Sequence, residues 1–252
     1  MAENPAERMA KAYFESEKVV AHYFREDHRV GLWNSEKCLL LKLFSKSEPI
    51  LDLGCGTGRI AFGMERLGFE QVVGADFSEG MVEGARQISE GLGSSVQFHC
   101  EDARKLPWAD GSFDGIIFGF NGWFMIPGAE DRFKALQEIF RVLRPGGRFV
   151  FTGHDRSQNN QERYWSAEAI EWEAGNQDRR KSDFGDVVAD TDSGTMYIHS
   201  TSQSETLATL EKVGFENVET WLRRELGNES SQVRDFSDEC RFWKAVKQVE
   251  PQ

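Results

Sequence analysis

The chain has 252 residues, a formal net charge of −12 and a pI of about 5.0. This length fits one large α/β domain, and the acidic balance argues against a wide basic face for nucleic acid. The polar start of the sequence predicts no signal peptide, and no apolar run reaches the roughly 20 residues of a membrane span, so we expect none. The four cysteines show no metal-ligand spacing, so we expect no metal and reduced thiols in the cytoplasm (Cys38, Cys55, Cys100 and Cys240).

Residues 1–45 are expected to form a cap of helices, because their hydrophobic residues show partial amphipathic spacing. The charged run at 25–29 is expected to interrupt these helices as an exposed link. Three aromatic residues of this region, Tyr13, Tyr23 and Trp33, could cover a ligand. Packing of the helices against a sheet is the favoured interpretation for each.

A short apolar strand runs through three alternating glycines into a helix. Residues 50–53 are predicted to form a buried strand, Gly54, Gly56 and Gly58 follow, and a helical pattern begins at about Arg59. Glycine permits a sharp turn or close approach of a ligand to the backbone. The N-terminus of a helix also offers unpaired N–H groups. These features together predict a ligand-binding loop.

The spacing of this loop separates two classes of ligand. A dinucleotide fingerprint requires glycine at the position that Arg59 occupies here. Asp52 precedes the loop, and its carboxylate would repel a pyrophosphate but would suit a cationic amine or sulfonium. A nicotinamide oxidoreductase is therefore disfavoured. Cys55 lies within the loop and is not expected to be a catalytic thiol.

The loop resembles motif I of the class I S-adenosylmethionine-dependent methyltransferases, and later segments keep the resemblance. The apolar run 71–76 ends in Asp76, which lies roughly two dozen residues beyond Asp52, as an acid that holds ribose hydroxyls does. A strand at 95–99 leads to the acid–small pair Asp102 and Ala103.

The segment 106–114, Leu-Pro-Trp-Ala-Asp-Gly-Ser-Phe-Asp, is similar to one common in small-molecule members of the family. Trp108 stands where those members usually have Phe. The resemblance covers residues 50–153 strongly and residues 204–248 more loosely.

The fold implied by the resemblance is α/β, with a Rossmann-like, seven-stranded, mostly parallel sheet in a single domain spanning 1–252. Residues 115–118 form the fourth strand, and the fifth follows a Pro145-Gly146-Gly147 turn. The sixth strand follows Gly214. The last strand, within 240–247, is expected to be antiparallel, because 227–239 leaves no room for an ordered crossover helix.

The resemblance implies S-adenosylmethionine as the cofactor. Asp76 would hold its ribose hydroxyls, Asp102 its adenine edge, and Phe77 and Met81 would pack on the base. The full set of residues expected at the cofactor is Asp52, Gly54, Cys55, Gly56, Gly58, Arg59, Asp76, Phe77, Met81, Asp102, Ala103 and Phe118.

Three residues after the fourth and fifth strands, Asn121, Trp123 and His154, are expected to face the methyl acceptor. Asn121 is not in the Asn/Asp-Pro-Pro-Tyr/Phe arrangement of enzymes that methylate amide or exocyclic amino nitrogens. This argues against DNA adenine and protein glutamine as acceptors. His154 could act as a base, but a hydrogen bond to a loop is favoured, so the catalytic residue stays open.

Residues 154–203 are expected to add a helix over 161–174 and a hairpin over 185–199. Ligands bind at the carboxyl ends of the strands in open α/β sheets, so this insertion is interpreted as a substrate lid. An edge or dimer hairpin is the alternative.

The expected function is S-adenosylmethionine-dependent transfer of a methyl group to an O, N or C nucleophile of a small molecule, by a monomer or homodimer. Two alternatives remain at this point. One is an RNA or protein methyltransferase, against which the acidic balance and the lack of an added binding domain count. The other is a protein that binds an S-adenosyl ligand without methylating anything.

Overall fold

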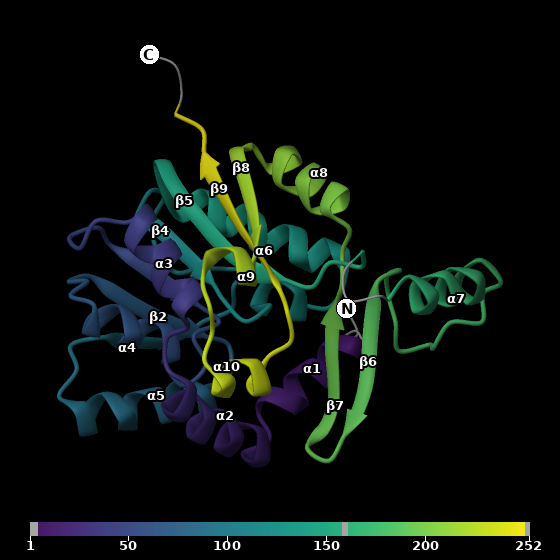
Figure 1. Cartoon of the computed structure of the whole chain (residues 1–252), viewed down its shortest axis with the longest axis horizontal. Coiled ribbons are helices and arrows are strands. Elements are labelled where there is room, and N and C mark those ends of the chain that lie inside the picture. The colour runs from purple at the N-terminus through teal and green to yellow at the C-terminus, as the bar shows by residue number, and fades with distance from the viewer. Residues whose placement is uncertain (1–4, 158–160, 250–252) are drawn as a thin grey trace.

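The computed structural model describes residues 5–157 and 161–249. Within them, the main sheet has seven strands in the order β3-β2-β1-β4-β5-β9-β8 (Figure 1). Its strands are β1 (Ile50–Leu53), β2 (Val72–Asp76), β3 (Gln97–Cys100), β4 (Phe113–Phe118), β5 (Leu143–Gly153), β8 (Phe215–Leu222) and β9 (Arg241–Lys247). Strands β1 to β5 pair in parallel, whereas β9 is antiparallel to both of its neighbours. The predicted Rossmann-like sheet with an antiparallel last strand is confirmed.

Helices cover both faces of this sheet. One face packs against α3 (Asn34–Leu43), α4 (Arg59–Arg66) and α5 (Glu79–Leu92), and the other against α6 (Ala129–Val142) and α8 (Gln203–Val213). Along β1, Ile50 belongs to the first core, while Leu51 and Leu53 belong to the second. This alternation follows from the two-residue period of a strand, and it buries both faces as parallel sheets require.

The N-terminal region forms α1 (Pro5–Phe14) and α2 (Glu17–Val30) before α3. The expected charged link at 25–29 is wrong, because α2 continues through it to Val30. Three of the five residues at 25–29 are Arg or Glu, which are good helix formers, so the charge of this run does not end the helix. The chain instead leaves the helix at Gly31, whose φ is +62°.

Two helices begin close to the strand ends of the sheet. Helix α4 begins at Arg59 as predicted, and Ser78 caps α5 by accepting a hydrogen bond from the Met81 N–H at 3.3 Å. The Pro145-Gly146-Gly147 segment, expected as a turn, lies inside β5. There the pairing with β4 shifts register between Phe113 and Gly115.

The connection from β8 to β9 contains only two short helices, α9 (Arg223–Leu226) and α10 (Ser231–Phe236). Neither acts as a crossover between parallel strands, because β8 and β9 are antiparallel neighbours. A further short helix, η1 (Gly122–Met125), follows β4.

The insertion after β5 consists of α7 (Glu162–Glu173) and a separate two-stranded hairpin, β6 (Asp186–Thr191) and β7 (Gly194–His199). The predicted helix and hairpin are therefore both present. Figure 1 shows α7 projecting beyond the hairpin, away from the main sheet. Strand β7 lies against α1, where a small apolar cluster joins them (Ala6, Ala10 and Tyr197, with Met9 and Val188).

Buried polar groups fasten the hairpin to α6. Asp186 accepts hydrogen bonds from the Tyr197 hydroxyl at 2.6 Å and from His199 Nδ1 at 2.8 Å. Arg132 of α6 binds Asp183 at 2.8 Å and also contacts the Tyr197 hydroxyl at 3.1 Å. Asp183, Asp186 and His199 lie close enough together to suggest a cation site. The Arg132 guanidinium already supplies the positive charge there, so the cluster is a structural hydrogen-bond network.

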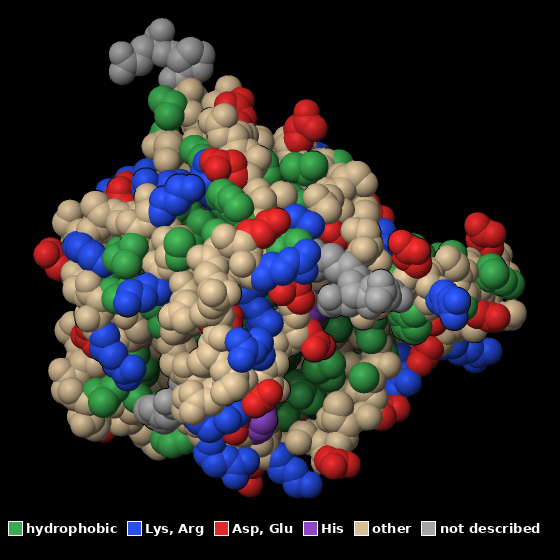
Figure 2. All heavy atoms as spheres, viewed as in Figure 1, with side chains coloured by type: hydrophobic (Ala, Val, Ile, Leu, Met, Phe, Trp, Pro, Cys, Tyr) green, Lys and Arg blue, Asp and Glu red, His purple; other side chains and the backbone are tan. Residues whose placement is uncertain are grey.

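On the face shown in Figure 2, basic and acidic side chains are interspersed, and a hollow with hydrophobic side chains at its base lies between the main body and the hairpin. Among the helices of the described residues, none combines the length and the apolar character that crossing a membrane requires.

Candidate functional site

A pocket lies at the carboxyl ends of β1, β2 and β4, where open α/β sheets bind ligands. About 970 Å³ of space lies between its walls, part of it open to solvent. Its walls come from the strand ends and from the N-terminal helices. The lining residues are Glu7, Ala10, Lys11, Phe14, Tyr23, Leu53, Gly54, Gly56, Asp76, Phe77, Met81, Glu101, Asp102, Ala103, Arg104, Phe118, Gly119, Phe120, Gly122, Met125, Ile126 and Pro127.

Asp76 sits at the end of β2 and lines this pocket. Its Oδ2 accepts the Gly56 N–H at 2.9 Å, and its Oδ1 accepts the Ser78 N–H at 2.9 Å. These two bonds fix the orientation of the carboxylate. Asp76 thereby ties the glycine loop to the start of α5 at the edge of the pocket.

The glycine loop turns through left-handed backbone conformations, with φ of +64° at Gly54, +55° at Gly56 and +94° at Gly58. A Cβ on Gly54 would lie 2.4 Å from the Phe118 ring, and one on Gly58 would lie 2.6 Å from the Phe62 ring. Gly54 and Gly56 line the pocket, whereas Gly58 does not. The third glycine is therefore required by packing beneath the loop.

Asp52 does not line the pocket, although the sequence predicted it at the cofactor. The residue is buried, and its Oδ2 accepts the Ala61 N–H at 3.0 Å near the N-terminus of α4. Burial, which outweighs the opposing effect of Arg59, raises the pKa of Asp52 to about 8. The described residues offer no hydrogen-bond partner to its Oδ1. Asp52 therefore supports the glycine loop through the start of α4 and not as part of the pocket lining.

Arg59 and Cys55 also lie outside the pocket lining, contrary to expectation. The Arg59 guanidinium forms a buried bidentate ion pair with Glu36 of α3, at 2.6 and 2.7 Å, and it stacks on the Trp33 ring. The Cys55 side chain is buried and its Sγ contacts the Gly56 carbonyl at 3.5 Å. Neither side chain is placed to touch a ligand.

Four other expected cofactor residues do line the pocket: Phe77, Met81, Asp102 and Ala103. Phe77 is 40% exposed, which is unusual for a large apolar side chain, and its ring contacts that of Phe14 edge-on. Phe118, at the end of β4, completes the expected group in the lining.

The three residues expected to face the acceptor are absent from the pocket lining. Trp123 is buried in the core, and its Nε1 donates to the Arg132 carbonyl at 2.9 Å, so its side chain packs in the core. Asn121 is also buried, and its Nδ2 lies 3.3 Å from His154 Nε2. Burial lowers the pKa of His154.

Phe120 takes the place in the pocket that the sequence analysis gave to Asn121. Both residues have positive φ, +47° and +62°, which is uncommon for residues other than glycine. The Asn121 N–H donates to Thr152 Oγ1 at 2.9 Å, holding this turn against β5. The turn directs Phe120 to the pocket, where its ring also stacks on Phe236 of α10.

Helix α1 supplies a wall that sequence reasoning missed. Glu7, Ala10, Lys11 and Phe14 all line the pocket. Their spacing places them on one helical face, so the pattern was present in the sequence. Of the three aromatic residues for which packing was favoured over contact with a ligand, Tyr23 lines the pocket, whereas Tyr13 and Trp33 do not.

The insertion is not itself the wall of the pocket. No described residue of 154–203 belongs to the lining, although this segment is predicted as a substrate lid. Strand β7 instead backs α1 through the cluster around Ala10 and Tyr197. The hairpin therefore supports the helix that closes the pocket.

The lining has two chemically different parts. Charged side chains cluster around Asp102, whereas an apolar wall consists of Tyr23, Phe118, Phe120, Met125, Ile126 and Pro127. Such a pocket can hold a polar nucleoside group and an apolar molecule side by side.

Comparison with known proteins agrees with this geometry. Residues 50–147 match the family model described as a methyltransferase domain. Over 113 residues the chain is 44% identical to demethylmenaquinone methyltransferase of Thermus thermophilus, covering 44% of this chain and 49% of that protein. It is 33% identical over 168 residues to the protein of that name from Listeria monocytogenes, covering 64% of this chain and 67% of that one. The chain thus spans about half the length of the first relative.

A crystal structure of a SAM-dependent methyltransferase from Methanosarcina mazei shares the fold, with a TM-score of 0.66 at 20% identity. The match covers 84% of this chain and 98% of that one. With the sheet order, the strand-end pocket and the sequence matches in agreement, the chain belongs to the class I S-adenosylmethionine-dependent methyltransferases.

Proposed function

We propose that this protein transfers the methyl group of S-adenosylmethionine to an apolar, ring-containing small molecule. The observation that carries the proposal is the composition of one pocket. The glycine loop and Asp76 lie in the same pocket as an aromatic and aliphatic wall that includes Phe118 and Phe120. The cofactor and an apolar acceptor could therefore occupy adjoining parts of it.

The residues that would hold the cofactor follow from the lining. Asp76 would accept hydrogen bonds from ribose hydroxyls, and Asp102 from the adenine amino group. Phe77 and Met81 would pack on the base. The backbone at Gly54 and Gly56 would approach the remainder of the molecule. The bound cofactor supplies an electrophilic methyl group, so the protein has mainly to orient the acceptor and exclude water.

The apolar wall offers no evident general base. Its described residues carry no histidine or carboxylate, and His154 lies outside the lining with a pKa lowered by burial. An acceptor that brings its own nucleophilicity, as an ionised phenol or hydroquinone or a neutral amine does, needs no base from this wall. The relatives named for demethylmenaquinone support a quinol ring as the first candidate. Such a ring offers an activated carbon and an oxygen as nucleophiles.

Transfer of a labelled methyl group tests this function. The protein is incubated with methyl-labelled S-adenosylmethionine and, in turn, a naphthohydroquinone lacking the methyl group, a simple phenol, an aliphatic amine, RNA and unfolded protein. We expect label in the two acceptors with an aromatic ring, the naphthohydroquinone and the phenol, and in none of the others. The Asp76→Ala variant should lose this labelling.

Two outcomes would contradict the proposal. Labelling of RNA or protein in preference to every small molecule would assign a different acceptor class. Binding of the cofactor with no label in any acceptor would favour a protein that binds an S-adenosyl ligand without methylating.

A further inference from the structure

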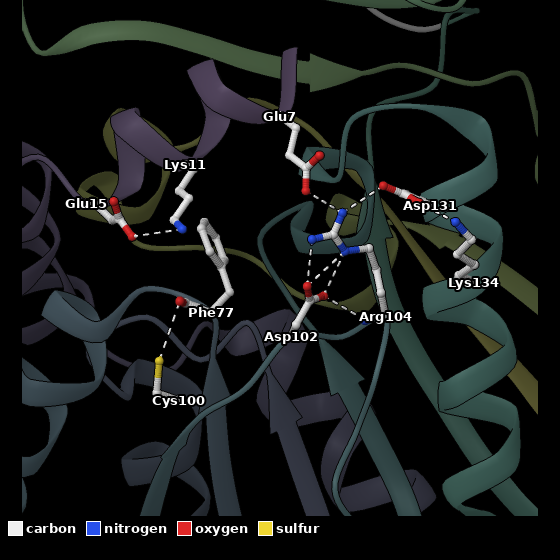
Figure 3. A network of polar contacts seen from close by, with 9 residues as sticks. All are labelled: Glu7, Lys11, Glu15, Phe77, Cys100, Asp102, Arg104, Asp131 and Lys134. Carbon is white, nitrogen blue, oxygen red and sulfur yellow. Dashed lines mark hydrogen bonds and ion pairs between the residues drawn. The ribbon is translucent and has the colours of Figure 1, made fainter. Parts of the chain in front are cut away.

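Arg104 lies at the centre of a charged cluster on the rim of the pocket (Figure 3). Its Nε and Nη2 donate hydrogen bonds to the Asp102 carboxylate at 2.9 and 2.7 Å. Its Nη1 donates to Glu7 of α1 at 2.6 Å and to Asp131 of α6 at 2.7 Å. One guanidinium thus joins three carboxylates from three separate segments, and one of them is the expected adenine ligand.

The three carboxylates are not equivalent. Asp131 has a second cation, because Lys134 lies 3.0 Å from it on the same helix. Asp102 keeps the backbone N–H of Arg104 as a further donor at 2.8 Å. Among the described residues, Glu7 has Arg104 as its only ion-pair partner. Losing this contact would therefore free Glu7 while leaving Arg104 held by the other two carboxylates.

Helix α1 is fastened at its two ends by different contacts. At its C-terminal end, Ser78 Oγ donates to the Phe14 carbonyl at 2.9 Å. Seven residues earlier, roughly 10 Å along the helix axis, Glu7 meets Arg104. A helix of ten residues is marginal in isolation, so α1 depends on these contacts and on the apolar cluster with β7.

We propose that Arg104 is a positioning residue that couples recognition of the cofactor at Asp102 to closure of α1 over the pocket. The inference rests on the proposed function, because it takes Asp102 as a ligand of the adenine. A ligand that orders Asp102 also orders the guanidinium bound to it, and an ordered guanidinium gives Glu7 a fixed docking point. Closure of α1 then brings Ala10 and Phe14 into the pocket wall, so the cofactor prepares the acceptor site.

Hydrogen exchange of α1 tests this coupling without requiring methyl transfer. Exchange of residues 5–14 is measured with and without saturating S-adenosylhomocysteine in the parent, in Glu7→Gln and in Asp131→Asn. In the parent, the ligand should slow exchange in α1 by about fivefold. Glu7→Gln should lose most of that protection and release the ligand about three- to fivefold faster. Asp131→Asn is the matched control and should keep the protection, because Arg104 still joins Glu7 to Asp102.

Salt provides a second readout when it is measured on the extra protection that the ligand gives to α1, because a merely structural ion pair would lose protection equally with and without ligand. Raising ionic strength should reduce this extra protection in the parent and have little effect in Glu7→Gln, because screening acts on a partly exposed ion pair. Equal protection of α1 in parent and Glu7→Gln would overturn the coupling while leaving cofactor binding intact. Failure of S-adenosylhomocysteine to bind the parent would overturn the proposed function, and the coupling with it.

Discussion

At the scale of single residues, Asp52 shows what a loop motif can and cannot predict. The sequence correctly placed an acid beside the glycine loop, but not the direction of its side chain. That direction is set by α4, whose Ala61 N–H meets the carboxylate at 3.0 Å. By contrast, Asp76 could be predicted at the pocket, because it ends a strand and the carboxyl ends of parallel strands share one edge.

The raised pKa of Asp52, about 8, makes stability depend on pH. Between about pH 4 and pH 8 the folded protein keeps this proton and the unfolded chain loses it. The stabilisation is therefore complete below pH 4 and is lost as the pH rises through 8. Asn cannot ionise, so Asp52→Asn should gain stability relative to the parent between pH 5 and 8, by up to about 1 kcal/mol per pH unit.

Urea unfolding of both proteins at pH 5, 6.5 and 8 measures this difference. Asp192→Asn, at an exposed acid in the hairpin turn, is the control and should follow the parent. A constant difference between Asp52→Asn and the parent at all three pH values would show that Asp52 is already ionised in the fold.

At the scale of elements, the strands and helices of 50–142 could be predicted well because their signals are local. Apolar runs of four to six residues, glycines after helices and Ser78 as a cap all act within a few residues. The ion pair that links α3 to α4 could not be predicted in this way. Glu36 and Arg59 lie 23 residues apart and meet only after the chain has folded.

The buried ion pair of Glu36 and Arg59 should contribute strongly to the stability of the fold. Both side chains are 5% exposed, so replacing one partner breaks a buried ion pair. Glu36→Gln should lower the free energy of unfolding by about 3–5 kcal/mol. Replacing both residues, as Glu36→Leu with Arg59→Met, should recover much of that loss because both buried charges are removed together. Thermal unfolding of the three proteins is the measurement, and an unaffected Glu36→Gln protein would contradict it.

At the scale of the whole molecule, the insertion and the N-terminal helices act together. The sequence predicted both as departures from the shared core, and a helix with a hairpin could be read from local turn signals. Their packing could not be read, because it depends on contacts such as Ala10 with Tyr197. Local signals therefore predict the hairpin as a lid. In the structure, α1 lines the pocket through Phe14, and the hairpin packs against α1.

Replacing residues 185–199 with a short Gly-Ser link tests this support. The strand-end residues Asp76 and Asp102 remain, so affinity for S-adenosylmethionine should stay within about tenfold, or roughly 1.4 kcal/mol. Methyl transfer to the acceptor should be lost, because α1 no longer has β7 behind it. Ala6→Arg, which changes a fully buried contact outside the pocket lining, should have the same effect without deleting the hairpin. Transfer at the parental rate in both variants would contradict the support role.

Calorimetric titration of the parent and of Asp76→Ala with S-adenosylmethionine tests cofactor binding in this pocket most directly. The parent should bind one molecule per chain and give no heat with NAD. Asp76→Ala, folded as judged by its melting curve, should bind about 1–3 kcal/mol more weakly, the usual cost of losing hydrogen bonds to a charged acceptor. Equal affinity in the folded Asp76→Ala protein, or binding of NAD in place of S-adenosylmethionine, would contradict the assignment of this pocket.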